Sequence, residues 1–146
     1  MTSRDAIADL IHAYAERLDA GDLDGVAALF AAATYGRPGG PVRHGTAEVR
    51  AALGVVKLHD GSPRTKHVIT NLIVDVDEAA GAATARSYFT VLQAAGTLPL
   101  QVILAGRYHD RFEHAGATWR FSERAIHIDL VGELREHLND PGRARR

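Results

Sequence analysis

The spacing of apolar residues changes once along the chain, at Pro63. Before Pro63, apolar side chains recur at steps of three and four residues, most clearly over Ile7–Leu18, which predicts helices. After Pro63, the period falls to two, which predicts strands. Helices segregated to one side of an antiparallel sheet make an α+β domain, and this is the fold class that we expect.

Capping and turn residues give approximate boundaries for the predicted helices and strands. Ser3 is expected to cap the first helix, which Gly21 ends, and Asp22 to cap a short second helix. Thr46 is expected to cap a third helix that extends to about Leu58, after a Gly- and Pro-rich loop at 36–41. Four strands are expected, at Lys66–Asp77, Ala82–Gln93, Leu100–Glu113 and Thr118–Val131. We expect one domain over residues 3–132 and a flexible C-terminal tail over residues 133–146.

Composition excludes several classes of function. The chain has no cysteine, which removes disulfide scaffolds, Cys-ligated metals and thiol catalysis. Its formal net charge of −1 argues against a general nucleic-acid partner. The apolar runs are too short for a membrane span, and the polar first residues do not resemble a signal peptide. We therefore expect a cytoplasmic protein with no nucleic-acid or membrane partner.

Four stretches in this order resemble the SnoaL-like branch of the nuclear-transport-factor-2-like superfamily. They are the run Tyr14–Asp22 with Ala28–Phe30, the run His44–Val49, the run Thr65–Asn71, and the run Gly106–Phe112 with Trp119–Arg124. The resemblance implies a cone, in which a curved antiparallel sheet wraps around the N-terminal helices, and a homodimer or higher homo-oligomer. The mouth of such a cone is a natural small-molecule pocket. The superfamily contains dehydratases, isomerases, dehydrochlorinases, polyketide cyclases and non-catalytic binders, so the fold alone does not assign a function.

The resemblance also implies site residues. Scytalone dehydratase, bile-acid dehydratases and hexachlorocyclohexane dehydrochlorinase pair an aspartate late in the first helix with a histidine that opens the first long strand. Asp19 and His67 match these positions. Tyr14 matches a tyrosine of the dehydratases, and Arg124 matches an arginine on the last strand. The strand Ala82–Gln93 departs from the pattern, because it lacks the second acid or histidine that related dehydratases place there.

The chemistry of these residues fits a proton-transfer site. An imidazole at His67 in a largely apolar pocket would be neutral at pH 7, as a general base must be. A carboxylate from Asp19 would fix its tautomer and stabilise the imidazolium. Tyr14 and Arg124 would stabilise developing negative charge. The alternatives are a core histidine, a solvated acid near a helix end, a core tyrosine and an arginine that extends to the rim.

Four further residues are candidates for substrate binding. Asn71 is expected on the same strand face as His67, and Thr90 is the polar candidate on the second long strand. Tyr35 and Tyr108 are expected as pocket walls. The other seven histidines fall in loops, near the tail or on surfaces, and their spacing predicts no metal site. No phosphate-binding loop or nucleophile elbow is present.

These features predict a cofactor-independent acid–base lyase or isomerase, dehydratase-like, that acts on a small, largely apolar molecule. A polyketide-cyclase-like reaction would use the same groups. A non-catalytic ligand-binding or assembly module, such as the small subunit of an oxygenase, is the alternative from another class.

Overall fold

Four long strands make up most of a curved, unclosed sheet in the computed structural model, which describes residues 1–142. They are β3 (Thr65–Asp77), β4 (Ala82–Ala95), β5 (Leu98–Ala115) and β6 (Thr118–Val131), each antiparallel to the next. Two short strands, β1 (Thr34–Gly36) and β2 (Val42–His44), continue the sheet, and β1 runs parallel to β6. The order across the sheet is β2–β1–β6–β5–β4–β3. The expected α+β class and the four long strands are confirmed.

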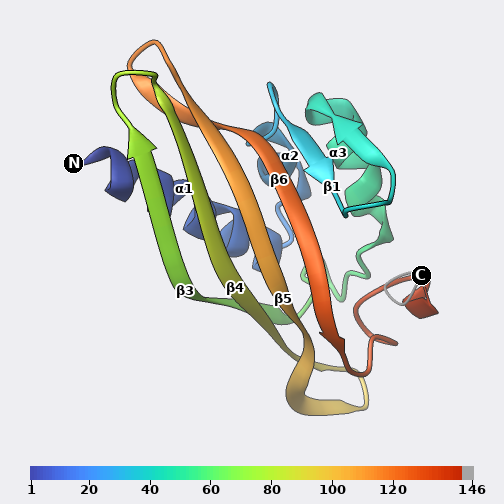
Figure 1. Ribbon diagram of the computed structural model, residues 1–146. Coiled ribbons are helices and arrows are strands. Elements are labelled where there is room, and N and C mark those ends of the chain that lie inside the picture. Colours follow the sequence, from blue (N-terminus) through green and yellow to red (C-terminus); the bar gives the residue numbers. More distant parts are fainter. Residues whose placement is uncertain (143–146) are drawn as a thin grey trace.

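The helices lie against the inner, concave face of this sheet. Helix α1 (Ser3–Asp19) runs behind the long strands in Figure 1, while α2 (Leu23–Ala28) and α3 (Gly45–Ala52) lie beside β1. The apolar stripe of α1 is buried, as its spacing predicts, and joins inward-facing side chains of the sheet in one core. This core fixes the end of α1 relative to the start of β3, where the candidate site lies.

Two helix ends differ from the sequence prediction. Thr2, not Ser3, caps α1, because its hydroxyl accepts the Asp5 N–H while the Asp5 carboxylate accepts the Thr2 N–H. Helix α3 begins at Gly45 after His44 rather than after a Thr46 cap, and it ends at Ala52 rather than near Leu58. Its last turn tightens into a 3₁₀ segment at Leu53–Val55.

The β1–β2 hairpin was not expected. The predicted loop at 36–41 overlaps it, since Gly36 is the last residue of β1 and the turn lies beyond it. Strands of three residues are too short to establish a period of two, so hydrophobic spacing could not reveal them.

A β-bulge interrupts β3 between Thr70 and Ile73. Asn71 has a positive φ of 53° at this bulge, a backbone conformation that asparagine adopts more readily than most residues. One extra residue reverses the faces of the strand beyond it, so Leu72 and Val74 point inward and Ile73 is exposed. The prediction that Asn71 lies on the same strand face as His67 is therefore wrong.

The packed part of the chain extends beyond residue 132. Leu134 is fully buried in the core, His137 is buried, and Leu138 forms a β-bridge with Val56. The predicted tail of 133–146 thus includes residues that pack on the domain, and residues 143–146 lie outside those described. Among the described residues, no helix is long and apolar enough to cross a membrane.

Candidate active site

The end of α1 and the start of β3 bring Asp19 and His67 together. Asp19 is the last residue of α1, and the chain turns at Gly21 with a φ of +79°. A side chain at Gly21 would overlap the Gly61 carbonyl, so glycine allows the segment that leads into β3 to pass against the helix end. On β3, the period of two points His67 toward the interior, as expected.

Three hydrogen bonds hold the carboxylate of Asp19. Its Oδ1 lies 2.6 Å from Nδ1 of His67 and 2.8 Å from Oγ1 of Thr65, and its Oδ2 accepts the backbone N–H of His67 at 2.8 Å. The side chains of His67 and Asp19 are only 5% and 10% exposed. Since Nδ1 faces the carboxylate, Nε2 is the ring nitrogen of His67 that is available for proton transfer.

The electrostatics of Asp19 favour its ionised form. Burial raises the pKa of this carboxyl, but the hydrogen bonds from His67 and Thr65 and the charge of His67 outweigh burial, and the net pKa is lowered. A carboxylate that stays ionised orients the imidazole and stabilises the cation that forms when Nε2 takes a proton.

Arg124 lies in the interior rather than at the rim. Its guanidinium binds Asp110 through two hydrogen bonds of 2.9 and 3.0 Å, and both side chains are fully buried. Burial lowers the pKa of Arg124, but the charge and hydrogen bonds of Asp110 outweigh burial, so the net pKa is raised and the guanidinium stays charged. Burial raises the pKa of Asp110, and the charge and hydrogen bonds of Arg124 oppose this rise. The sequence interpretation missed Asp110 as the partner of Arg124.

Three tyrosines surround this buried ion pair. The guanidinium carbon of Arg124 lies 3.6 Å from the ring centre of Tyr108 and 4.3 Å from that of Tyr14. The hydroxyls of Tyr14 and Tyr35 are 2.7 Å apart. Burial raises the pKa of all three phenols, so each is neutral and can donate a hydrogen bond at pH 7. The structure therefore brings Tyr14, Tyr35, Tyr108 and Arg124 together in one cluster.

Two of the expected substrate-binding residues belong neither to the His67–Asp19 pair nor to the cluster of Arg124 and the tyrosines. Asn71 is exposed at the β3 bulge. Thr90 pairs with the exposed Val68 and alternates with the buried Phe89 and Val91, which places it on the outer face of the sheet. Neither residue lies on the side of the sheet that carries His67.

His137 lies in the interior, whereas the sequence interpretation placed it among the histidines in loops or near the tail. It is 5% exposed, and burial lowers its pKa to about 4. Glu136, the residue before His137, accepts a hydrogen bond from Gln93, and Gln93 lies opposite Thr65, whose hydroxyl donates to Asp19. The segment that carries His137 therefore runs close to the His67–Asp19 pair. The spacing of Leu134 and Leu138 around His137 is the one sequence signal of this burial, and at a single helical turn it is too short to predict it.

Two surface hollows, each of about 440 Å³, lie away from this pair. One is lined by the start of α1 and the β5–β6 turn, and the other by the far ends of β3, β4 and β5. Neither borders His67 or Asp19. Within residues 1–142, no group of three or more histidine or carboxylate side chains is arranged to hold a metal ion.

Comparisons with known proteins agree with this architecture. The model of the SnoaL-like domain matches residues 1–125. No curated protein matches the sequence. A solved variant of Rv3472 from Mycobacterium tuberculosis, a protein of unknown function, is 26% identical, with a TM-score of 0.70 over 86% of this chain and 71% of that one.

Two further solved structures are similar in fold. A candidate scytalone dehydratase from Novosphingobium aromaticivorans is 22% identical, with a TM-score of 0.70 over 87% of this chain and 84% of that one. ActVI-ORFA from Streptomyces coelicolor is 20% identical, with a TM-score of 0.73 over 88% and 98% of the two chains.

Proposed function

Because the chain belongs to the SnoaL-like domain family, which includes dehydratases and polyketide cyclases, we propose that it is a cofactor-independent acid–base enzyme. The reaction is a dehydratase-like elimination or an isomerisation of a small, largely apolar molecule. The observation that carries this proposal is the 2.6 Å contact between Nδ1 of His67 and Oδ1 of Asp19, in a setting where both side chains are almost buried.

His67 acts as the general base in this mechanism. Its Nε2 takes a proton from a carbon next to a carbonyl group, and Asp19 stabilises the imidazolium through Nδ1–H. In an elimination, the electrons of the broken C–H bond form the C=C bond, and the C–O bond to the hydroxyl breaks. The proton held by His67 then joins the departing hydroxide, so that water leaves and the base is restored. An isomerisation returns the same proton to another carbon.

Arg124 and Tyr14 are the candidates to stabilise the developing enolate. Arg124 uses two of its nitrogens to bind Asp110, and its Nη1 has no partner among the described residues, so a donor is available. Tyr14 is neutral and buried, and its hydroxyl bonds to that of Tyr35. Fixed donors in a dry interior stabilise negative charge more strongly than water does.

Two model ketones test the proposal. Proton NMR in D₂O would follow exchange of the acidic C–H of 1-tetralone, and absorbance would follow the conversion of 3-hydroxy-1-tetralone to 1-naphthol as water is lost. We expect the wild type to accelerate at least one reaction, His67→Ala to slow it by about 10²–10⁴-fold, and the exposed control His12→Ala to match the wild type. Equal rates for wild type and His67→Ala would contradict the proposal. Saturable binding of both ketones without turnover would favour a ligand-binding module.

We also propose a homodimer that forms through the outer face of the sheet. This face carries exposed apolar side chains on neighbouring strands, among them Val68, Tyr88, Val102 and Leu130. Exposed apolar groups that gather on one surface are typical of protein interfaces. Light scattering on the purified chain would measure the mass, and a monomer at all accessible concentrations would contradict the dimer.

A further inference from the structure

Two buried polar atoms near the His67–Asp19 pair have no hydrogen-bond partner among the described residues. They are Oε1 of Gln93 and Nδ1 of His137. Buried polar groups in folded proteins are almost always hydrogen-bonded, because an unpaired group loses its bond to water and gains nothing in return. Two such atoms beside one candidate site therefore suggest that a bound group supplies the missing bonds.

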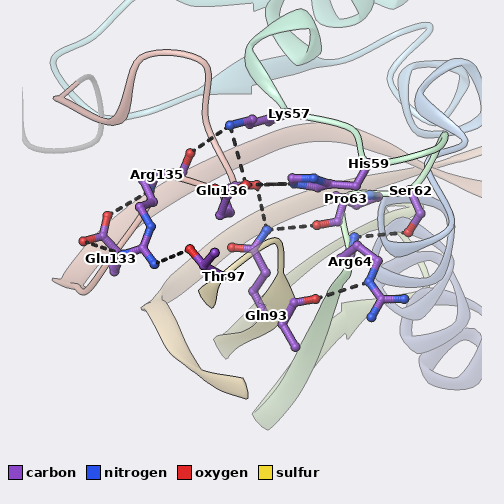
Figure 2. A network of polar contacts seen from close by, with 11 residues as sticks. Lys57, His59, Ser62, Pro63, Arg64, Gln93, Thr97, Glu133, Arg135 and Glu136 are labelled. Atoms are coloured by element: carbon purple, nitrogen blue, oxygen red, sulfur yellow. Dashed lines mark hydrogen bonds and ion pairs between the residues drawn. The ribbon is translucent and has the colours of Figure 1, made fainter. Parts of the chain in front are cut away.

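Gln93 lies next to the pair through the register of the sheet. It is opposite Thr65 on β3, the residue whose hydroxyl donates to Asp19. Its Nε2 donates to the carbonyls of Pro63, at 3.0 Å, and Glu136, at 2.8 Å (Figure 2). Because both of these partners are acceptors, the free atom of this amide is its oxygen, which can only accept a hydrogen bond.

His137 reaches the interior on the segment that follows β6. Its carbonyl accepts the N–H of Lys57 at 2.8 Å, and its own N–H donates to Leu134. Glu136 anchors the same segment, because its carbonyl accepts bonds from Gln93 and from Nε2 of His59, as Figure 2 shows. The pKa of about 4 means that the His137 ring is neutral at pH 7. A neutral imidazole has one nitrogen that donates and one that accepts.

We propose that Gln93 and His137 form a subsite beside the His67–Asp19 pair that binds a hydroxyl group of the substrate. A hydroxyl placed between the two side chains would donate to Oε1 of Gln93 and accept from Nδ1–H of His137, so that one group would satisfy both unpaired atoms. A carbonyl or carboxylate can only accept, and it would leave Oε1 of Gln93 unpaired. This inference rests on the proposed function and narrows its substrate to a hydroxylated molecule.

Two probes that differ by one hydrogen-bond donor test this subsite without any turnover. 2-Naphthol carries a hydroxyl, whereas the oxygen of 2-methoxynaphthalene can accept but not donate. Isothermal titration of the wild type is expected to give about tenfold tighter binding of 2-naphthol, the value of one net hydrogen bond. The preference should fall to about twofold or less in His137→Leu and persist in the exposed control His12→Ala.

A second measurement uses the wild type alone and does not depend on how the variant folds. In a sample with ¹⁵N-labelled histidine, 2-naphthol should shift the ring-nitrogen signal of His137, and 2-methoxynaphthalene should not. Equal affinity for the two probes with no shift of this signal would mean that a buried water fills the subsite, and would overturn the inference. Failure of both probes to bind at their solubility limits would also overturn it.

The outcomes separate this subsite from the proposed function. His67→Ala is expected to retain the preference for 2-naphthol while it loses turnover of the model ketones. If turnover does not depend on His67 but the preference depends on His137, the proposed function fails and the subsite stands. If turnover depends on His67 and the preference is absent, only the subsite fails.

Discussion

Acidification from pH 7 to pH 5 is expected to destabilise the fold through His137. Its ordinary pKa is 6.5, and burial lowers it to about 4 in the folded chain. As the pH falls below 6.5, the His137 imidazole becomes protonated in the unfolded chain, whereas in the folded chain it stays neutral until about pH 4. Stability is therefore lost across this window as the pH falls. The loss is about 2 kcal/mol at pH 5 and about 3 kcal/mol once the pH is below both values.

Urea denaturation at pH 7 and pH 5 would measure this loss, with His137→Leu as the matched variant. Leucine is apolar and does not titrate, so the variant should lose about 2 kcal/mol less than the wild type between the two pH values. His12→Ala removes an exposed histidine and should behave as the wild type. The lowered pKa of Asp19 affects stability only below its ordinary value of 3.8, outside this range. Equal losses in wild type and His137→Leu, within about 0.5 kcal/mol, would refute the reasoning.

Four other changes have defined outcomes. Asp19→Asn removes the carboxylate that orients His67, and model-ketone turnover should fall by about 10²–10⁴-fold. The amide nitrogen cannot accept a hydrogen bond, so this variant should also lose about 1–3 kcal/mol in urea denaturation. Asp110→Asn leaves the buried guanidinium of Arg124 unpaired and should cost about 3–5 kcal/mol in urea denaturation, so a loss below about 1 kcal/mol would contradict the buried ion pair. Gly106→Ala would overlap a backbone carbonyl and a phenyl ring, and should lower the melting temperature or prevent folding. Tyr88→Glu places a charge on the outer face and should give a monomer by light scattering if the dimer uses that face.

Hydrophobic spacing predicted the long elements because each repeats its pattern over many residues. The start of β3 followed the period of two, so the inward orientation of His67 could be deduced. The bulge between Thr70 and Ile73 could not be deduced, because Leu72 and Ile73 are both apolar and either could face the core. Asn71 was placed on the wrong face for this reason.

The buried partner of Arg124 was hidden by a second irregularity. From the β5–β6 turn, a regular register would place Asp110 opposite Glu123, but the pairing shifts between Arg111 and Phe112 and brings Asp110 opposite Arg124. A bulge moves every pair beyond it by one residue, and no periodicity in the sequence marks it. His137 was missed because one helical turn is too short for a pattern to be distinguished from chance.

The two buried carboxylates of the interior are suited to different tasks. Both oxygens of Asp110 bind the guanidinium of Arg124, which does not release a proton at any accessible pH, so Asp110 holds a fixed positive charge in place. Asp19 instead binds a ring with a second nitrogen, and that nitrogen can take a proton and return it. In the proposed mechanism, proton transfer is therefore the role of His67 and Asp19. Arg124 and the tyrosines around it are the groups that would stabilise an anionic intermediate in that mechanism.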